Sequence, residues 1–374
     1  MSTSTNDMNS SPSKTKKPAD SAFKQQRLPA WQPILTAGTV LPTFFVIGIA
    51  FIPVGIGLLY FSDEVREHTT DYTNCKSNNT LRDFGETCTN VIQKDPKLAC
   101  FCEIDIELPT DFFGNVYMYY GLTNFYQNHR RYVKSRDDNQ LLGVVSKEVS
   151  TDCIPFAYEG SNELPIVPCG AIANSLFSDE LSLLRKKDSE IVPLLRTGIA
   201  WPSDKRIKFR NPEGNLSEIF KNNPKPKNWT KTIYELDLEN DDNNGFQNED
   251  LIVWMRTAAL PTFRKLYRRI DHSKAGFRDG LVEGNYTLIV KYSFSVYSFE
   301  GRKRMILSTT SLLGGKNPFL GIAYIVVGCI CLVMGLALLI IHIKCSKSRC
   351  RKISSIRFIN MKMKRKRTVL LLYE

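Results

Sequence analysis

Six cysteines lie in the long segment between the two most apolar stretches of this chain. They are Cys75, Cys88, Cys100, Cys102, Cys153 and Cys169. An even number of cysteines in an oxidising compartment is typical of disulfide formation, so we predict three disulfides. Metal binding is the competing chemistry. It is disfavoured because the segment has no C-x-x-C pair and only three scattered histidines. The residue types alone leave the disulfide connectivity open.

The same segment carries four N-x-[ST] sequons. Their asparagines are Asn78, Asn215, Asn228 and Asn285. A sequon accepts an N-linked glycan in a secreted or lumenal domain, at the surface. Together with the cysteines, the sequons predict that residues 62–318 form a disulfide-bonded, glycosylated domain on the extracytoplasmic side of a membrane.

The sequence lacks the motifs of the common catalytic sites. It contains no G-x-x-x-x-G-K-[ST], no D-K-T-G-T, no H-E-x-x-H and no G-x-S-x-G. A membrane-bound hydrolase is an alternative. Its catalytic triad would have to use His68, His129 or His272, of which the last two are the most plausible, and none lies in a recognisable catalytic pattern. We therefore predict that the chain is not an enzyme and binds no cofactor and no metal.

Residues 240–251 imitate a calcium loop, with oxygen-bearing side chains at alternating positions and Gly245 at the sixth. The first position is Asn240 rather than Asp, and the twelfth is Leu251 rather than the bidentate Glu. We interpret this segment as a turn built from Asx side chains and glycine.

The elements that hold the large domain are two apolar stretches, residues 35–61 and 319–343, neither of which contains Asp, Glu, Lys or Arg. Each exceeds the ~20 residues that a helix needs to cross the hydrocarbon core of a bilayer. We predict two transmembrane helices. A soluble core helix is rarely so long without a charge, and a cleaved signal peptide has a shorter apolar region. The glycines and prolines of the first stretch are typical of a helix packed on protein.

Positive charge flanks the two predicted spans. Residues 1–34 carry five Lys or Arg against two Asp or Glu, and residues 344–374 carry eleven against one, whereas residues 62–318 are nearly neutral. Basic flanks stay in the cytosol, so both termini are predicted to be cytosolic. The first part of residues 1–34 is expected to be disordered, and the part beside the membrane interfacial. The basic tail is expected to attract anionic lipids. The charge map disfavours nucleic acid as a partner.

The large domain is predicted to be mostly β. Residues 286–299 alternate apolar and polar side chains, as a half-buried strand does. A turn at residues 300–301 would let residues 304–310 return antiparallel to it. Residues 115–120 are a second β-like run, and residues 249–270 look helical with an interruption at Pro261. We expect an antiparallel, sandwich-like fold.

Several segments of the chain resemble the cell-division-cycle-fifty family, the accessory subunits of type-IV P-type ATPases that flip lipids. In order, they are residues 23–33, 114–138, 168–175, 208–212, 243–267 and 301–325. The resemblance is to animal members and covers most of residues 23–343. It implies a heterodimer with the catalytic ATPase subunit, a role in folding of the pump and its exit from the endoplasmic reticulum, and aminophospholipid transport to the cytosolic leaflet. It also implies residence in the endoplasmic reticulum, Golgi, secretory vesicles and plasma membrane.

The resemblance further implies particular residue roles. The nested disulfides would be Cys75–Cys102 and Cys88–Cys100, with Cys153–Cys169 separate. Contacts with the pump are expected in the juxtamembrane segment, at Phe23, Arg27, Leu28 and Trp31. The sequence departs from the familiar pattern in the wider spacing of Cys75 and Cys88 and in the basic tail after Lys344.

A second hypothesis from another class is a free-standing receptor or adhesion glycoprotein that binds its ligand in trans. Such a protein would not need the segment from Phe23 to Trp31. Replacing that segment by a neutral linker would leave trans binding intact under the receptor hypothesis and would impair pairing under the subunit hypothesis.

Overall fold

The computed structural model describes residues 19–29, 36–79, 83–95, 98–160, 164–311 and 314–370, with side chains up to residue 347. By their internal contacts these residues form two compact units. The central unit spans Gly55–Ile322, and we call it the central domain. The terminal unit combines residues up to Val54 with residues from Ala323 onward. The interfacial residue Trp31 lies outside the described ranges.

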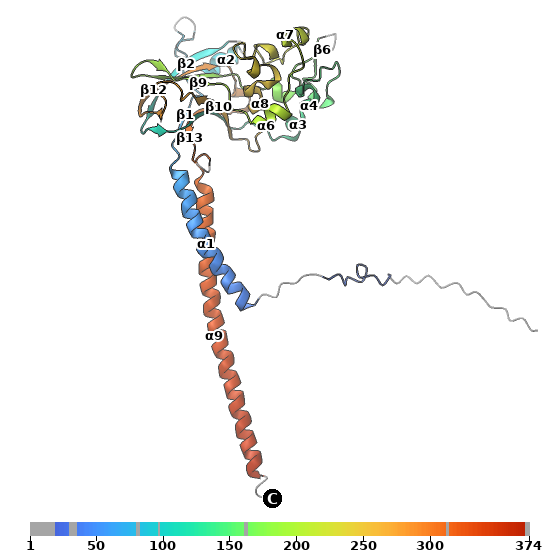
Figure 1. Cartoon of the computed structure of the whole chain (residues 1–374), viewed down its shortest axis with the longest axis vertical. Coiled ribbons are helices and arrows are strands. Elements are labelled where there is room, and N and C mark those ends of the chain that lie inside the picture. The colour runs from blue at the N-terminus through green and yellow to red at the C-terminus, as the bar shows by residue number, and fades with distance from the viewer. Residues whose placement is uncertain are drawn as a thin grey trace, which may run out of the picture. The chain divides into compact units, whose positions relative to one another are not determined.

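Two long helices flank the central domain in the sequence, α1 (Ala37–Asp63) and α9 (Pro318–Leu370). Each is long and apolar enough to cross a membrane by length and composition. Pro42 and Pro53 lie inside α1 without ending it. The apolar stretches predicted at residues 35–61 and 319–343 fall almost entirely within these helices. Helix α9 continues beyond the apolar stretch, through the basic residues, as one helix (Figure 1).

Two antiparallel sheets form the centre of the central domain. The five-stranded sheet has the order β1 (Glu67–Asp71), β13 (Lys303–Thr309), β4 (Val116–Leu122), β10 (Phe263–Ile270) and β9 (Leu194–Leu195). The four-stranded sheet has the order β2 (Cys100–Leu108), β12 (Gly284–Tyr292), β7 (Glu180–Arg185) and β8 (Glu190–Ile191). Two short ribbons pair β3 (Phe112–Phe113) with β11 (Gly280–Leu281) and β5 (Tyr158–Glu159) with β6 (Leu164–Pro165). The predicted antiparallel β-rich domain is thus confirmed.

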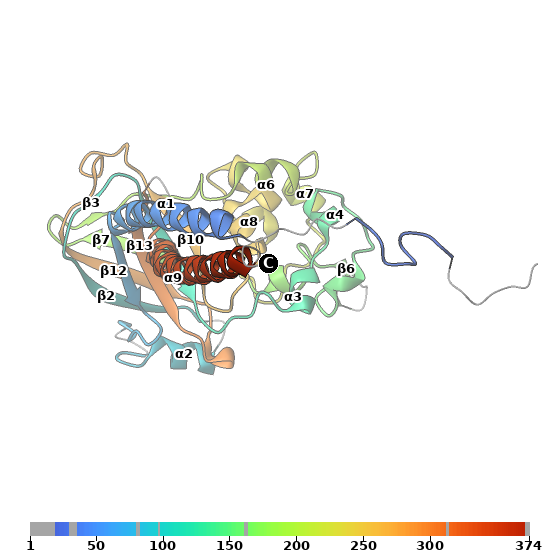
Figure 2. The same ribbon diagram turned by 90° about the horizontal axis from the view of Figure 1, so that it is seen from below.

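Short helices interrupt the strands. The α-helices are α2 (Cys88–Lys94), α3 (Arg130–Lys134), α4 (Asp138–Leu141), α5 (Ala171–Asn174), α6 (Pro202–Ile207), α7 (Leu216–Ile219) and α8 (Glu249–Met255). The 3-10 helices are η1 (Thr151–Cys153), η2 (Ile233–Glu235), η3 (Asp241–Asn243), η4 (Gly245–Gln247) and η5 (Tyr297–Phe299). Figure 2 shows α3, α4, α6, α7 and α8 gathered at one end of the domain, with most strands at the other.

Both sheets contribute to one hydrophobic core. Met118 and Leu307 of the five-stranded sheet and Leu288 and Val290 of the four-stranded sheet are fully buried in the same cluster. Aromatic rings fill its centre. The ring of Tyr120, for example, stacks on Phe177 with centroids 4.0 Å apart. Aromatic side chains bury large areas and pack with defined geometry, so this cluster gives the domain much of its stability.

The helical prediction for residues 249–270 is only half right. Helix α8 ends at Met255, and the chain returns as strand β10 from Phe263. Residues from Phe263 to Arg269 pair antiparallel with β4. The local pattern suggested a helix on both sides of Pro261, but pairing with a strand more than 100 residues earlier overrides it.

The predicted hairpin of residues 286–299 with 304–310 is wrong, although both strands exist. Strand β12 ends at Tyr292, and β13 pairs with β1 and β4 in the other sheet. The physical reason lies just after β12. The backbone N–H groups of Ser293 and Phe294 donate to the Asp179 carboxylate, each at 2.6 Å, instead of to a neighbouring strand. The chain therefore leaves one sheet here and enters the other.

Candidate functional site

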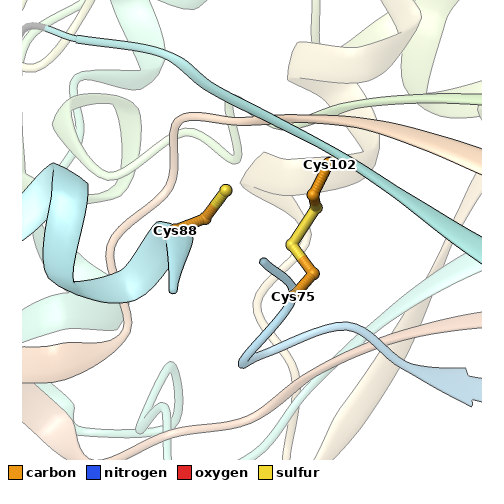
Figure 3. Close-up of side chains that lie close together, drawn as sticks. All are labelled: Cys75, Cys88 and Cys102. Carbon is orange, nitrogen blue, oxygen red and sulfur yellow. A yellow bond between two sulfur atoms is a disulfide. The ribbon is translucent and has the colours of Figure 1, made fainter. Parts of the chain in front are cut away.

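The three disulfides join Cys75 with Cys102, Cys88 with Cys100, and Cys153 with Cys169, the pairs that the family resemblance implies. The Cα–Cα distances are 6.0, 5.4 and 5.7 Å, within the ordinary range for a disulfide. Cys100 and Cys102 both lie on β2, so the two nested bonds fasten α2 and the chain around Cys75 to one strand. Figure 3 shows the bond between Cys75 and Cys102 with Cys88 beside it.

The same cysteines are also the best candidates for a metal-binding site. Cys75, Cys88 and Cys102 form the one close group of potential metal ligands among the described residues. All three sulfurs are engaged in disulfides, with Cys100 as the fourth partner. A thiolate is the ligand form of cysteine, so these sulfur atoms have no free valence for a metal. The sequence interpretation of these cysteines as a disulfide framework is consistent with this geometry.

The calcium-like loop folds as the turn predicted for it. Asn240 caps η3 by accepting a hydrogen bond from the backbone N–H of Asp242 at 3.1 Å. The side-chain amide of Asn243 donates to Asp237 at 2.6 Å, and Asn244 accepts from the N–H of Gly245 at 2.9 Å. These oxygen atoms bind the loop's own amide groups, as Asx turns do.

The two histidines considered for catalysis lie in different settings. His272 uses both ring nitrogens on the backbone: Nε2 accepts from the N–H of Val116 at 3.2 Å, and Nδ1 is 2.6 Å from the carbonyl of Phe277. It therefore joins the start of β4 to the loop before β11. His129 is exposed and precedes α3. The contacts of His272 give it a structural role.

A buried ion pair at the junction of the two sheets escaped the sequence analysis. The Nζ atom of Lys303 lies 2.6 Å from the Asp179 carboxylate, and both side chains are fully buried. Asp179 also accepts from the Tyr72 hydroxyl at 3.1 Å and from the two N–H groups after β12. Lys303 donates to the Phe294 carbonyl at 2.6 Å as well and lies over the Tyr292 ring. These bonds satisfy both charges and tie the end of β12 to β13.

Burial controls the protonation of this pair. Loss of solvation lowers the pKa of Lys303 to about 8, although the neighbouring Asp179 carboxylate opposes the shift. The pKa of Tyr72 is raised by burial first and by Asp179 second. At neutral pH the Lys303 side chain is therefore charged and the Tyr72 hydroxyl is neutral.

A second buried lysine closes the end of α8. The Nζ atom of Lys265 donates to the carbonyls of Val253, Trp254 and Arg256 at 3.0, 2.6 and 2.8 Å. The last carbonyls of a helix have no partner within the helix, and a cation there is also favoured by the helix dipole. Burial lowers the pKa of Lys265. Lys265 therefore fixes where α8 ends and β10 begins.

Within the terminal unit, α1 and α9 pack through glycines. A Cβ atom on Gly48 would lie 2.6 Å from the Leu332 side chain and 3.0 Å from the Gly328 carbonyl. A Cβ on Gly328 would lie 2.9 Å from Ile52. The two backbones approach closely where neither residue has a side chain, as membrane helices commonly do. Other apolar side chains of the spans stay uncovered, among them Val46, Ile49, Val333 and Ile340.

The four residues expected to contact a pump fall in or next to the short described segment 19–29. Phe23 is 76% exposed and Leu28 57% exposed. Arg27 forms one surface ion pair, with Asp20 at 3.9 Å. Trp31 lies outside the described residues. Two of the four therefore present apolar surface that no described part of the chain covers.

The four sequon asparagines are all exposed on the central domain. Asn78 donates to Glu103 at 3.0 Å, and Asn285 lies on β12. Asn215 caps α7, accepting from the N–H and the hydroxyl of Ser217. An asparagine must be exposed at the surface to carry an N-linked glycan, and all four meet this condition.

The described residues thus combine two helices long enough to cross a membrane with a disulfide-bonded antiparallel domain. Residues 58–348 match the family described as LEM3 (ligand-effect modulator 3) family / CDC50 family. The chain is 54% identical to Cell cycle control protein 50A of Mus musculus, over 88% of this chain and 90% of that protein. It is 46% identical to Cell cycle control protein 50B of Homo sapiens, over 87% and 94%. It is 42% identical to ALA-interacting subunit 3 of Arabidopsis thaliana, over 88% and 87%.

This chain is a membrane protein that belongs to the CDC50 family. The resemblance drawn from its sequence segments is thereby confirmed, including the likeness to animal members.

Proposed function

We propose that this chain is the non-catalytic accessory subunit of a type-IV P-type ATPase that moves aminophospholipids to the cytosolic leaflet. The observation that carries the proposal is family membership over residues 58–348. One relative is named as an interacting subunit, and its likeness extends over 88% of this chain. The subunit would support folding of the pump, its exit from the endoplasmic reticulum and its transport cycle. It would reside with the pump in the Golgi, secretory vesicles and plasma membrane.

In this proposal the central domain is extracytoplasmic and both termini are cytosolic. Disulfides persist in oxidising compartments, and the central domain carries three. The basic residues follow the apolar part of α9, which favours a cytosolic C-terminus and contact with anionic lipid headgroups there. The exposed asparagines at 78, 215, 228 and 285 would then carry N-linked glycans.

The pump would contact two features of the terminal unit, besides the central domain. The first is the juxtamembrane segment, through Phe23, Arg27, Leu28 and Trp31. Its support is the uncovered apolar surface of Phe23 and Leu28. The second feature is the part of the α1 and α9 surfaces that is not buried between the two helices. These faces are apolar and uncharged, as the surface of a helix inside a membrane protein complex is.

The test is co-expression with candidate type-IV ATPases, followed by affinity purification in mild detergent and analysis of glycan maturation. We expect one pump to co-purify and to leave the endoplasmic reticulum only when this chain is present. Alanine at positions 23, 27, 28 and 31 together should reduce co-purification. Serine at Lys14, Lys16 and Lys17 is the matched control and should not. A chain that matures alone and captures no pump would contradict the proposal.

A further inference from the structure

Two clefts of the central domain meet at one sequon. The residues Asn228, Trp229 and Thr230, which we call the sequon ridge, line both a cleft of about 870 Å³ and a smaller one of about 150 Å³. Leu176 and Ser178 also border both clefts. A glycan attached to Asn228 would therefore begin in the wall of a cleft.

Hydrogen bonds fix the sequon ridge in place. The backbone N–H of Asn228 donates to the side chain of the buried Asn174 at 3.2 Å. The indole N–H of Trp229, whose side chain is buried, donates to the Ala173 carbonyl at 2.6 Å. The first sugar on Asn228 would thus start from a rigid point with a defined direction, whereas a glycan on a loose loop would not.

The larger cleft has the chemistry that a sugar requires. Its lining combines the aromatic residues Phe125, Phe294 and Phe299 with the hydroxyl groups of Ser178, Ser293, Ser295 and Ser298 and with Lys225 and Lys227. A pyranose ring has apolar C–H faces that pack on aromatic rings, and a rim of hydroxyls that hydrogen-bond to hydroxyl and ammonium groups. Clefts of several hundred Å³ are the size that holds a small organic ligand.

We propose that the N-linked glycan of Asn228 folds back and that its first sugars occupy the larger cleft as a structural part of the central domain. Attachment replaces one hydrogen of the Asn228 side-chain amide by the reducing-end carbon of a glycan delivered on a lipid-linked pyrophosphate; the lipid pyrophosphate and a proton leave. The inference rests on the proposed extracytoplasmic placement of this domain. A glycan on Asn215 is the internal reference, because that residue caps the short helix α7 with Ser217 exposed beside it.

The experiment compares the two sites in one molecule. The full-length chain is purified with its pump, and glycans are released by a peptide amidase in water labelled with oxygen-18, which marks each released asparagine as a labelled aspartate. Peptide mass spectrometry then gives a release rate for each site. We expect release at Asn228 to be at least tenfold slower than at Asn215 in the native protein, and the two rates to be equal after reduction and unfolding. We also expect less processed glycans at Asn228.

A variant that keeps the glycan but fills the cleft sharpens the test. Ser298 is exposed and lines the larger cleft. S298W should expel the sugars and raise the native release rate at Asn228 to that at Asn215. N228Q should lower the thermal midpoint by about 2–4 °C, while N285Q, at an exposed sequon position on β12, leaves it unchanged.

Equal native release rates at Asn228 and Asn215 would overturn the inference. So would a chain glycosylated at Asn215 and bare at Asn228, and in that case the extracytoplasmic placement would stand. A chain bare at both asparagines but glycosylated at Asn78 or Asn285 would overturn the inference alone, and a chain without glycan at any of the four sequons would overturn both the inference and the placement.

Discussion

The central domain and the paired helices of the terminal unit are held together by different means. In the central domain, three disulfides, a buried Lys303–Asp179 ion pair and an aromatic core act together. In the terminal unit, α1 and α9 meet along a narrow line around Gly48 and Gly328, and most of their apolar surface stays uncovered.

The difference indicates which unit of the chain needs other molecules to cover its apolar surface. The central domain satisfies its buried charges and covers its own core, so it has what an independently stable domain needs. The two helices cover only a small part of each other's apolar surface, so lipid or another protein must cover the rest. Changes in the central domain should therefore alter stability, and changes on the helices should alter association.

The largest effect is expected from breaking the buried ion pair. Asp179→Ala would leave the Lys303 ammonium buried without its counter-ion, which costs about 3–5 kcal/mol of unfolding free energy. The measurement is denaturant unfolding of the full chain in detergent, followed by tryptophan fluorescence. The neighbouring Glu180→Ala is the matched control. Glu180 pairs with Lys291 at the surface, and loss of an exposed pair costs about 0–1 kcal/mol. Equal effects of the two substitutions would show that the buried pair does not hold the sheets together.

Removal of the outer nested disulfide should have the next largest effect on the free energy of unfolding. Serine at both Cys75 and Cys102 frees the chain around Cys75 from β2, and a disulfide of this kind contributes about 2–4 kcal/mol. The same unfolding experiment measures the loss. Serine at Cys345 is the control, because that cysteine is free and lies on α9. A double variant as stable as the parent chain would mean that hydrogen bonding around Ser77 and Asn78 already holds this segment.

A substitution in the helix pair should leave the central domain intact. Gly48→Leu forces a side chain against Leu332 and the Gly328 backbone, at a cost of about 1–3 kcal/mol to helix packing. We expect a broader distance distribution between spin labels at Thr39 and Ile340, with the unfolding midpoint of the central domain unchanged. Gly57→Leu is the control, since a Cβ there meets no atom within 4 Å. A lowered midpoint for Gly48→Leu would show that the packing of the helices contributes to the stability of the central domain.

The smallest effect is a pH dependence. The pKa of Lys303 is about 8 in the folded chain, below the ordinary value of 10.5 for a lysine. The unfolded chain therefore binds more protons between these values, so stability from this group is absent below pH 8 and increases as the pH rises toward 10.5. Between pH 7 and 9 the gain is about 1 kcal/mol.

Comparing this slope in the parent chain and in a D179L/K303M double variant isolates the contribution of Lys303. The double variant replaces both charges, so neither partner is left buried alone. Identical slopes in the two proteins would contradict the lowered pKa.

The sequence predicts the parts of this protein that depend on local composition. The apolar stretches correspond to α1 and α9 because a long uncharged run has few alternatives to a membrane helix. Alternation along residues 286–292 marks β12 because Tyr286, Leu288, Val290 and Tyr292 all face the core. Local patterns did not predict which strands pair. Strand β13 lies beside β1, whose residues are more than 230 positions earlier, and no local signal records that partner.

The buried charges were missed for a related reason, although a signal existed. On β13, Lys303 shares a face with Met305 and Leu307, both fully buried, so period-two alternation places the lysine in the core. Its partner Asp179 lies 124 positions away in an irregular segment and carries no pattern. For Phe23 and Leu28 the limit is different. Their exposure is visible, but their role as pump contacts comes from the family resemblance and stays a prediction.

The position of β13 has a consequence for how the chain is made. This strand lies between β1 and β4 in the sheet, and α9 follows it within a few residues. While the chain is still emerging from the ribosome, β1 and β4 both have an open edge, and the nested disulfides near Cys88 can already close. The sheet becomes complete only when residue 309 is available, just before the second apolar stretch enters the membrane. A prematurely terminated chain would therefore expose unpaired strand edges, which readily pair with strands of other chains.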